Sequence, residues 1–176
     1  MIRFPAASYA AVRKSLNQYG DAVQPELPRP SCTVMLVCGP PCAGKSRYVR
    51  EHAREGDTVI DLDEIAKEQG FGRDRPADVA GQLLHDRNQR LAELAGKPRS
   101  HVAWVIIAAP SRQLREWWRN KLNARITLLV PSREVLLERA AADPERQGML
   151  PLQQKLIDQW FDRELNSRSE VRERGR

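Results

Sequence analysis

The chain has 176 residues, of which 41% are hydrophobic and 30% charged, so it is large enough for one globular domain with its own core. Its longest apolar run, residues 102–109, is far shorter than the ~20 residues that cross a membrane, and no secretory apolar stretch follows Arg3; we expect a cytoplasmic protein with no membrane partner. The 29 basic and 23 acidic residues leave a net charge of +6, which fits either a solvated basic surface or a polyanionic partner such as nucleic acid.

Residues 1–30 are predicted to form an appendage to the domain. An amphipathic helix that ends at Gly20 is indicated by apolar side chains at helical spacing: Tyr9, Val12, Leu16 and Tyr19. Residues 24–30 contain three prolines, and each proline biases the residue before it away from helix. We therefore expect an extended linker there.

Strand and helix patterns alternate through residues 31–169, the predicted domain. Ser111 and Ser132 are expected to cap two of the helices. The alternation predicts an α/β fold in which a parallel sheet lies between helices. Residues 166–176 are polar and are expected to fray, with 170–176 as a charged tail. Four apolar strands are expected, at residues 32–38, 58–60, 101–109 and 126–130.

The first strand is followed by a Gly-x4-Gly-Lys-Ser pattern and then by a helical segment, residues 45–54. Such a loop folds around a phosphate with its amides pointing inward, the lysine reaches the β and γ phosphates, and the serine hydroxyl ligates magnesium. The helix N-terminus adds a favourable field for the anion. The pattern predicts a site for ATP or GTP with Mg²⁺, in which Ser46 binds the metal. The residues expected to contact nucleotide are Gly39, Pro40, Pro41, Cys42, Ala43, Gly44, Lys45, Ser46 and Arg47.

Three cysteines lie around this strand and loop: Cys32, Cys38 and Cys42. No second pair of ligands follows them, as a zinc site would require, so reduced thiols are expected. Cys42 lies inside the loop, where a small filler is a better interpretation than a nucleophile.

Two aspartates, Asp61 and Asp63, follow the second strand, at the edge of an open α/β sheet that faces the ligand crevice. An aspartate there can accept the proton of an acceptor hydroxyl and contact the substrate during phosphoryl transfer. Either can also open the next helix as its N-cap, and the two roles are compatible. No acid ends the third or the fourth strand, in residues 108–111 or 130–132, which argues against a motor ATPase.

Arginines beyond the fourth strand predict a lid. Arg139 and Arg146 flank a helix break at Asp143-Pro144, and a mobile arginine that closes over the transferred phosphoryl group stabilises its charge. Two ordinary surface arginines are the alternative in a chain with 29 basic residues. Arg73 and Arg75 lie in a glycine-bearing loop near the expected acceptor crevice, so both are candidate substrate contacts.

The phosphate loop, the Asp-x-Asp after the second strand and the arginine-bearing lid resemble the P-loop kinases of the polynucleotide-kinase type. These are related to zeta-toxin-like and small-metabolite kinases. The resemblance covers residues 32–165. It implies a three-layer P-loop NTPase fold with a four-stranded parallel sheet in the order 2-3-1-4 and a small lid.

By this resemblance Lys45 and Ser46 hold phosphate and magnesium, and Asp63 activates the acceptor with Asp61 beside it. Arg146 is the better match for the catalytic lid arginine, and Arg139 is a second candidate. The chain also departs from the family, which often has an acid at the end of the third strand. Because this acid is missing, the resemblance leaves open how the outer coordination shell of Mg²⁺ is completed and how fast the protein turns over.

The expected function is therefore ATP- and Mg²⁺-dependent transfer of the γ-phosphate to a hydroxyl, and the basic charge suggests a nucleic-acid 5′ end as the acceptor. A kinase of a small metabolite or nucleotide is the alternative enzyme. A different class is a nucleotide-binding module of a nucleic-acid-processing assembly with little turnover. The missing acid after the third strand favours the module, whereas Asp63 and Arg146 favour the enzyme.

Overall fold

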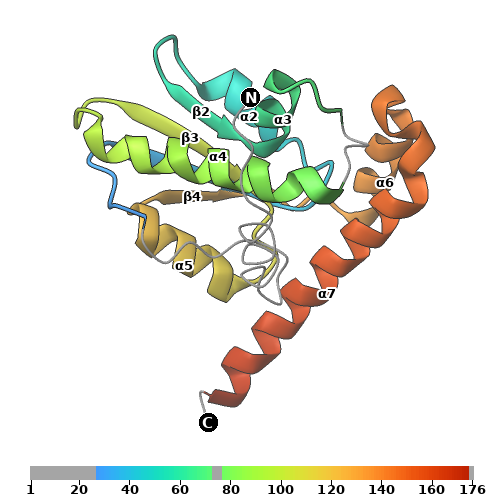
Figure 1. Cartoon of the computed structure of the whole chain (residues 1–176). Coiled ribbons are helices and arrows are strands. Elements are labelled where there is room, and N and C mark those ends of the chain that lie inside the picture. The colour runs from blue at the N-terminus through green and yellow to red at the C-terminus, as the bar shows by residue number, and fades with distance from the viewer. Residues whose placement is uncertain (1–26, 73–76, 175–176) are drawn as a thin grey trace.

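The computed structural model describes residues 27–72 and 77–174, and shows one parallel sheet with helices on both faces (Figure 1). The strand order is β2-β3-β1-β4, as predicted. β1 pairs with β3 along its whole length and with β4 toward its carboxyl end. The predicted helix within residues 1–20, together with Arg73 and Arg75, lies outside the described residues. The strands are β1 Thr33–Cys38, β2 Thr58–Asp61, β3 Val102–Ile107 and β4 Arg125–Leu128.

The helices begin and end close to their predicted positions. Both serine caps are present: Ser111 Oγ accepts from the amide of Leu114 at 3.2 Å, and Ser132 Oγ accepts from the amide of Val135 at 3.4 Å. No helix in the described ranges is long and apolar enough to cross a membrane. The α-helices are α2 Lys45–His52, α3 Leu62–Glu68, α4 Ala80–Glu93, α5 Arg112–Leu122, α6 Arg133–Ala142 and α7 Leu150–Arg174. Short 3₁₀ helices are η1 Ala77–Val79, η2 Leu94–Gly96 and η3 Pro144–Met149.

The core lies on both faces of β1, because successive side chains of a strand point to opposite sides of the sheet. Val34 and Leu36 belong to a large buried cluster with apolar side chains of α4 and α5. Val37 points the other way and packs with Val49 of α2 and with Trp104. Burial on both faces explains why the sequence of this strand is apolar without interruption.

The last helix differs from the prediction. Fraying was expected from residue 166, but α7 continues to Arg174, and its end projects away from the body of the domain (Figure 1). The physical reason is that no glycine or proline interrupts the sequence between Pro151 and Gly175, so nothing in the backbone ends the helix earlier.

The described end of the predicted linker packs on the domain. Leu27 is 9% exposed and belongs to the main core cluster. Arg29 Nη2 donates to Asn123 Oδ1 at 3.0 Å, just after α5. Residues 27–30 are therefore held against the domain. Their proline content indicates an extended backbone, which is compatible with this packing.

Buried polar contacts fasten α7 to the turn that follows β3. Trp160 Nε1 donates to the carbonyl oxygen of Ala108 at 2.9 Å. Arg115 of α5 donates to the carbonyl oxygen of Ala109 at 2.9 Å and forms an ion pair with Glu164 at 2.7 Å, in which both side chains are only 8% exposed. Removing one partner of a buried ion pair costs about 3–5 kcal/mol, so these contacts hold the turn firmly.

Ala109 adopts a left-handed backbone with φ of +36°, a conformation that costs an L-residue about 1–3 kcal/mol. Glycine avoids that cost, although it loses roughly 0.5–1 kcal/mol through its greater freedom in the unfolded chain. We expect Ala109→Gly to raise Tm by about 2–4 °C in thermal unfolding followed by circular dichroism. The control is Ala103→Gly in the fully buried middle of the sheet, which should lower Tm. Equal destabilisation by both changes would contradict the strain at Ala109.

Candidate active site

A cleft of about 590 Å³ opens at the carboxyl ends of β1, β2 and β3, the edge at which α/β sheets bind their ligands. Its walls come from the phosphate loop, α2, α3 and α4, and from a lid formed by α6, η3 and the start of α7. We call the part lined by residues 41–47 the nucleotide half. The acceptor half is the part lined by Asp63, Glu64, Lys67, Arg87, Met149, Leu152 and Leu156.

The phosphate loop requires glycine at both of its ends. Gly39 has φ of +150°, and a Cβ there would lie 2.2 Å from the carbonyl oxygen of Leu129. Gly44 has φ of +89° and is the N-cap of α2, so its left-handed backbone turns the chain into the helix. Between them Cys42 packs against the small buried cluster of α6 and α7, which is the filler role predicted for it.

Lys45 is held by the loop itself. Its Nζ donates to the carbonyl oxygens of Gly39 at 2.9 Å and Pro40 at 2.8 Å. Burial lowers the pKa of Lys45 to about 8, while the nearby carboxylates of Asp61 and Asp63 act in the opposite direction. The ammonium group is therefore positioned at the loop, and its charge is sensitive to mildly alkaline pH.

The two aspartates after β2 have separate positions. Asp61 is 7% exposed, accepts from Ser46 Oγ at 2.8 Å, and caps α3 by accepting from the amide of Asp63 at 3.1 Å. Burial raises the pKa of Asp61, and these two hydrogen bonds oppose the rise. Asp63 lies in the first turn of α3 and lines the cleft. The N-cap prediction thus holds for Asp61, whose carboxylate lies beside Ser46.

Ser46 and Asp61 fit a magnesium ion by the chemistry of their oxygens. Mg²⁺ prefers hard oxygen donors, keeps several waters and usually takes one or two carboxylates together with substrate phosphates. A serine hydroxyl and a buried carboxylate that already touch each other supply such a set next to the phosphate loop.

Arg139 reaches the phosphate loop from α6. Its Nη1 donates to the carbonyl oxygens of Cys42 and Ala43, both at 3.3 Å. Arg47, which was expected to contact nucleotide, lies at the rim of the cleft with its side chain 78% exposed and forms an ion pair with Glu51 at 2.7 Å. The two arginines thus differ: one lies over the loop, and the other faces solvent.

Arg146 lines the cleft from η3 with its side chain 12% exposed. Its Nε donates to Asp143 Oδ2 at 2.8 Å, and its Nη1 donates to Gln153 Oε1 at 2.5 Å. Both predicted lid arginines therefore border the site, and Arg146 is oriented by partners in η3 and α7.

Arg87 of α4 lines the acceptor half, although no motif predicts it. It is 3% exposed, its guanidinium carbon lies 5.3 Å from the ring centre of Trp118, and its Nη2 donates to Asn88 Oδ1 at 3.3 Å. The sequence does contain a signal, because Arg87 falls between Leu84 and Leu91 at helical spacing. A charged residue within an apolar stripe is costly to bury without a purpose.

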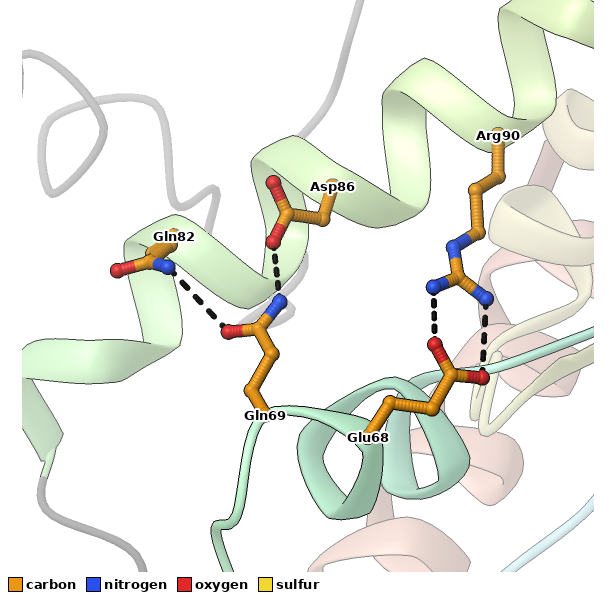
Figure 2. Close-up of polar contacts among 5 residues, drawn as sticks. All are labelled: Glu68, Gln69, Gln82, Asp86 and Arg90. Carbon is orange, nitrogen blue, oxygen red and sulfur yellow. Dashed lines mark hydrogen bonds and ion pairs between the residues drawn. The ribbon is translucent and has the colours of Figure 1, made fainter. Parts of the chain in front are cut away.

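Polar side chains join α3 to α4 (Figure 2), namely Glu68, Gln69, Gln82, Asp86 and Arg90. Both terminal nitrogens of Arg90 donate to the carboxylate of Glu68. The side-chain amide of Gln69 donates to Asp86 and accepts from Gln82. These contacts fix the helix that carries the cleft aspartate relative to the helix that carries the buried arginine.

Residues 34–160, which include the phosphate loop, both aspartates and both lid arginines, match the family model AAA_33, described as an AAA domain. The chain belongs to this family of P-loop NTPases. None of the curated proteins matches the sequence. The match does not separate the polynucleotide-kinase type from other members, so that subtype stays a prediction.

Two solved kinase structures align with the chain. The shikimate kinase from Acinetobacter baumannii, in complex with shikimate, aligns with a TM-score of 0.50 and 19% identity, over 74% of this chain and 75% of its own. A gluconokinase from Sinorhizobium meliloti 1021 aligns with a TM-score of 0.47 and 21% identity, over 74% of this chain and 75% of its own. At 19% identity the likeness to the shikimate kinase concerns the fold alone.

The pKa of Lys45 predicts how nucleotide affinity changes with pH. In the free protein the ammonium loses its proton above pH about 8. Bound phosphates favour the charged form, so binding above that pH requires uptake of a proton. We expect the Kd of a Mg²⁺ complex of a non-hydrolysable ATP analogue to rise by up to about tenfold per pH unit above pH 8, measured by calorimetry.

Lys45→Met should remove this pH dependence, whereas Lys155→Met, an exposed lysine of α7 outside the cleft, should keep it. An affinity of the unmodified protein that is constant from pH 7 to pH 9.5 would contradict the prediction.

Proposed function

We propose that this protein is a magnesium-dependent kinase that transfers the γ-phosphate of ATP to a hydroxyl of a small molecule. The observation that carries the proposal is the hydrogen bond between Ser46 and Asp61 beside the phosphate loop. Asp63 follows Asp61 by two residues and lines the same cleft. A metal-side carboxylate and a second carboxylate toward the acceptor are what phosphoryl transfer to an alcohol needs.

In this proposal Lys45 and the amides at the start of α2 bind the β and γ phosphates. Ser46 and Asp61 hold Mg²⁺, which when bound neutralises charge on the phosphate oxygens. Asp63 accepts the proton of the acceptor hydroxyl while the hydroxyl oxygen forms a bond to the γ-phosphorus. At the same time the bond between the γ-phosphorus and the oxygen of the leaving ADP breaks. Arg139 and Arg146 stabilise the charge on the transferred group from the lid side.

Several observations favour a small acceptor over a nucleic-acid 5′ end. The acceptor half is part of a bounded cleft, and three apolar side chains of the lid line it: Met149, Leu152 and Leu156. Exposed arginines on several helices are paired with carboxylates, as in Arg47–Glu51, Arg90–Glu68, Arg119–Glu116 and Arg133–Asp158. Such pairing supports the interpretation of the net charge as a solvated surface. The small substrate in the name of the shikimate kinase agrees with this choice.

A nucleotide-binding module with little turnover is the second candidate, and one observation favours it. The turn after β3 carries no acid, and the carbonyl oxygens of Ala108 and Ala109 are bonded to Trp160 and Arg115. Labelled ATP, Mg²⁺ and a panel of small alcohols and 5′-hydroxyl oligonucleotides decide between the candidates. Label on small alcohols supports the kinase, label on oligonucleotides alone supports a polynucleotide kinase, and nucleotide binding without transfer supports the module.

Asp63→Asn keeps the size of the side chain but removes its basicity. We expect kcat for the labelled acceptor to fall by at least about 100-fold, because a general base contributes roughly 10²–10⁴-fold. The Kd for ATP should change by less than about twofold, since Asp63 is not assigned to the nucleotide. Asp162→Asn, an exposed aspartate of α7 outside the cleft, is the matched control. A normal kcat in Asp63→Asn would exclude the base.

Arg146→Ala tests the lid. We expect kcat to fall by about 10²-fold or more while the Kd for ATP stays nearly constant, because the arginine would act on charge that develops during transfer. Arg133→Ala on α6 removes a half-exposed arginine that pairs with Asp158 at 2.6 Å outside the cleft, and should leave kcat unchanged. A loss of affinity alone in Arg146→Ala would show that the arginine binds nucleotide rather than the transition state.

A further inference from the structure

The acceptor half of the cleft combines two kinds of surface. One is charged and comes from α3 and α4, where Lys67 pairs with Glu64 at 3.1 Å and Arg87 supplies a buried cation. The other is apolar and comes from η3 and the first turns of α7, where Met149, Leu152 and Leu156 lie. A pocket lined in this way prefers a ligand with both a charged and an apolar part, because each kind of surface binds the matching part of the ligand.

The charged surface contains one buried guanidinium, that of Arg87. Arg87 is 3% exposed, lies over the ring of Trp118 and is bonded to Asn88, so its side chain keeps one orientation. The contacts between α3 and α4 hold its helix in place (Figure 2). A positioned guanidinium in a partly enclosed cleft binds a carboxylate or a similar anion more strongly than a solvated one.

The apolar surface consists of side chains that are unusually exposed for their type. Leu152 is 49% exposed and Leu156 is 39% exposed, and their spacing of four residues places them on one side of α7. Met149 precedes Leu152 by three residues and extends the same surface. All three line the cleft, so a ligand bound there that covers them removes apolar surface from water.

We infer that the acceptor is a small alcohol that carries one anionic group and an apolar body. The anion binds at Arg87, the apolar body packs on Met149, Leu152 and Leu156, and the hydroxyl reaches Asp63. This inference rests on the proposed function and deepens it by naming the class of acceptor. A polyol, which offers no apolar body, and a neutral alcohol, which offers no anion, each satisfy only one of the two surfaces.

The test is a binding comparison that needs no turnover. Four probes cross the two features: 3-phenyllactate is anionic and apolar, 3-phenylpropane-1,2-diol is neutral and apolar, glycerate is anionic and polar, and glycerol has neither feature. Each is measured by ligand-observed NMR with Mg²⁺ and a non-hydrolysable ATP analogue, and each class includes two further members with different apolar groups or chain lengths. We expect the class that is both anionic and apolar to bind at least about tenfold more tightly than either single-feature class.

Two pairs of variants assign the preference to its surfaces. Leu152→Ser should weaken the apolar acids by about fivefold to tenfold, while Leu165→Ser, at the more exposed leucine of α7 outside the cleft, should not. Arg87→Met should abolish the preference for acids, while Arg119→Met, at an exposed arginine of α5 outside the cleft, should keep it. If Arg87→Met does not fold, the four wild-type classes and the leucine pair still decide.

Equal binding of neutral or polar probes, or binding by none of the classes, would overturn the inference. The same probes are then tested for transfer from labelled ATP, which separates this inference from the proposed function. Binding of apolar acids without transfer of label to any alcohol keeps the ligand class and overturns the kinase. Transfer to polyols in preference to apolar acids keeps the kinase and overturns the ligand class.

Discussion

The buried carboxylate of Asp61 joins the end of β2, the start of α2 and the start of α3. One of its oxygens accepts from Ser46 in the phosphate loop, and the other accepts from the amide of Asp63 in the next helix. Burying a carboxylate is costly unless donors compensate, and both donors here belong to elements that form the site. The phosphate loop and the helix that carries Asp63 are therefore both bonded to this one side chain.

The lid contributes charge in two different ways. Arg139 donates to the carbonyl oxygens of Cys42 and Ala43, so it stabilises the folded conformation of the phosphate loop. Arg146 is paired with Asp143 and bonded to Gln153, so its charge is partly compensated before any phosphate arrives. In the proposed reaction, the transferred phosphoryl group offers more negative charge than a single carboxylate, and an exchange of partners by Arg146 would couple the position of the lid to the progress of the transfer.

Local patterns predicted much of the fold. The Gly-x4-Gly-Lys-Ser loop, the serine caps of α5 and α6 and the unbroken apolar sequence of β1 each depend on neighbours in the chain, and the strand order followed once the family resemblance was seen. Contacts between residues that are far apart in the sequence could not be predicted from local patterns. Arg87 has its place because Trp118 of another helix lies beneath it, and Arg115 is neutralised by Glu164, 49 residues away. The end of α7 was misplaced because polar composition suggested fraying, whereas a helix ends where its backbone is interrupted.

The carbonyl oxygen of Ala108 has two donors, the amide of Gly39 at 3.3 Å and Trp160 Nε1 at 2.9 Å. One atom of the turn after β3 thus connects the first glycine of the phosphate loop with the last helix of the domain. The indispensable part of the chain consequently extends well past the lid, because the indole that supports this carbonyl is contributed by α7. A shortened form that stops before Trp160 would retain every residue of the Gly-x4-Gly-Lys-Ser motif and still lose the support behind it.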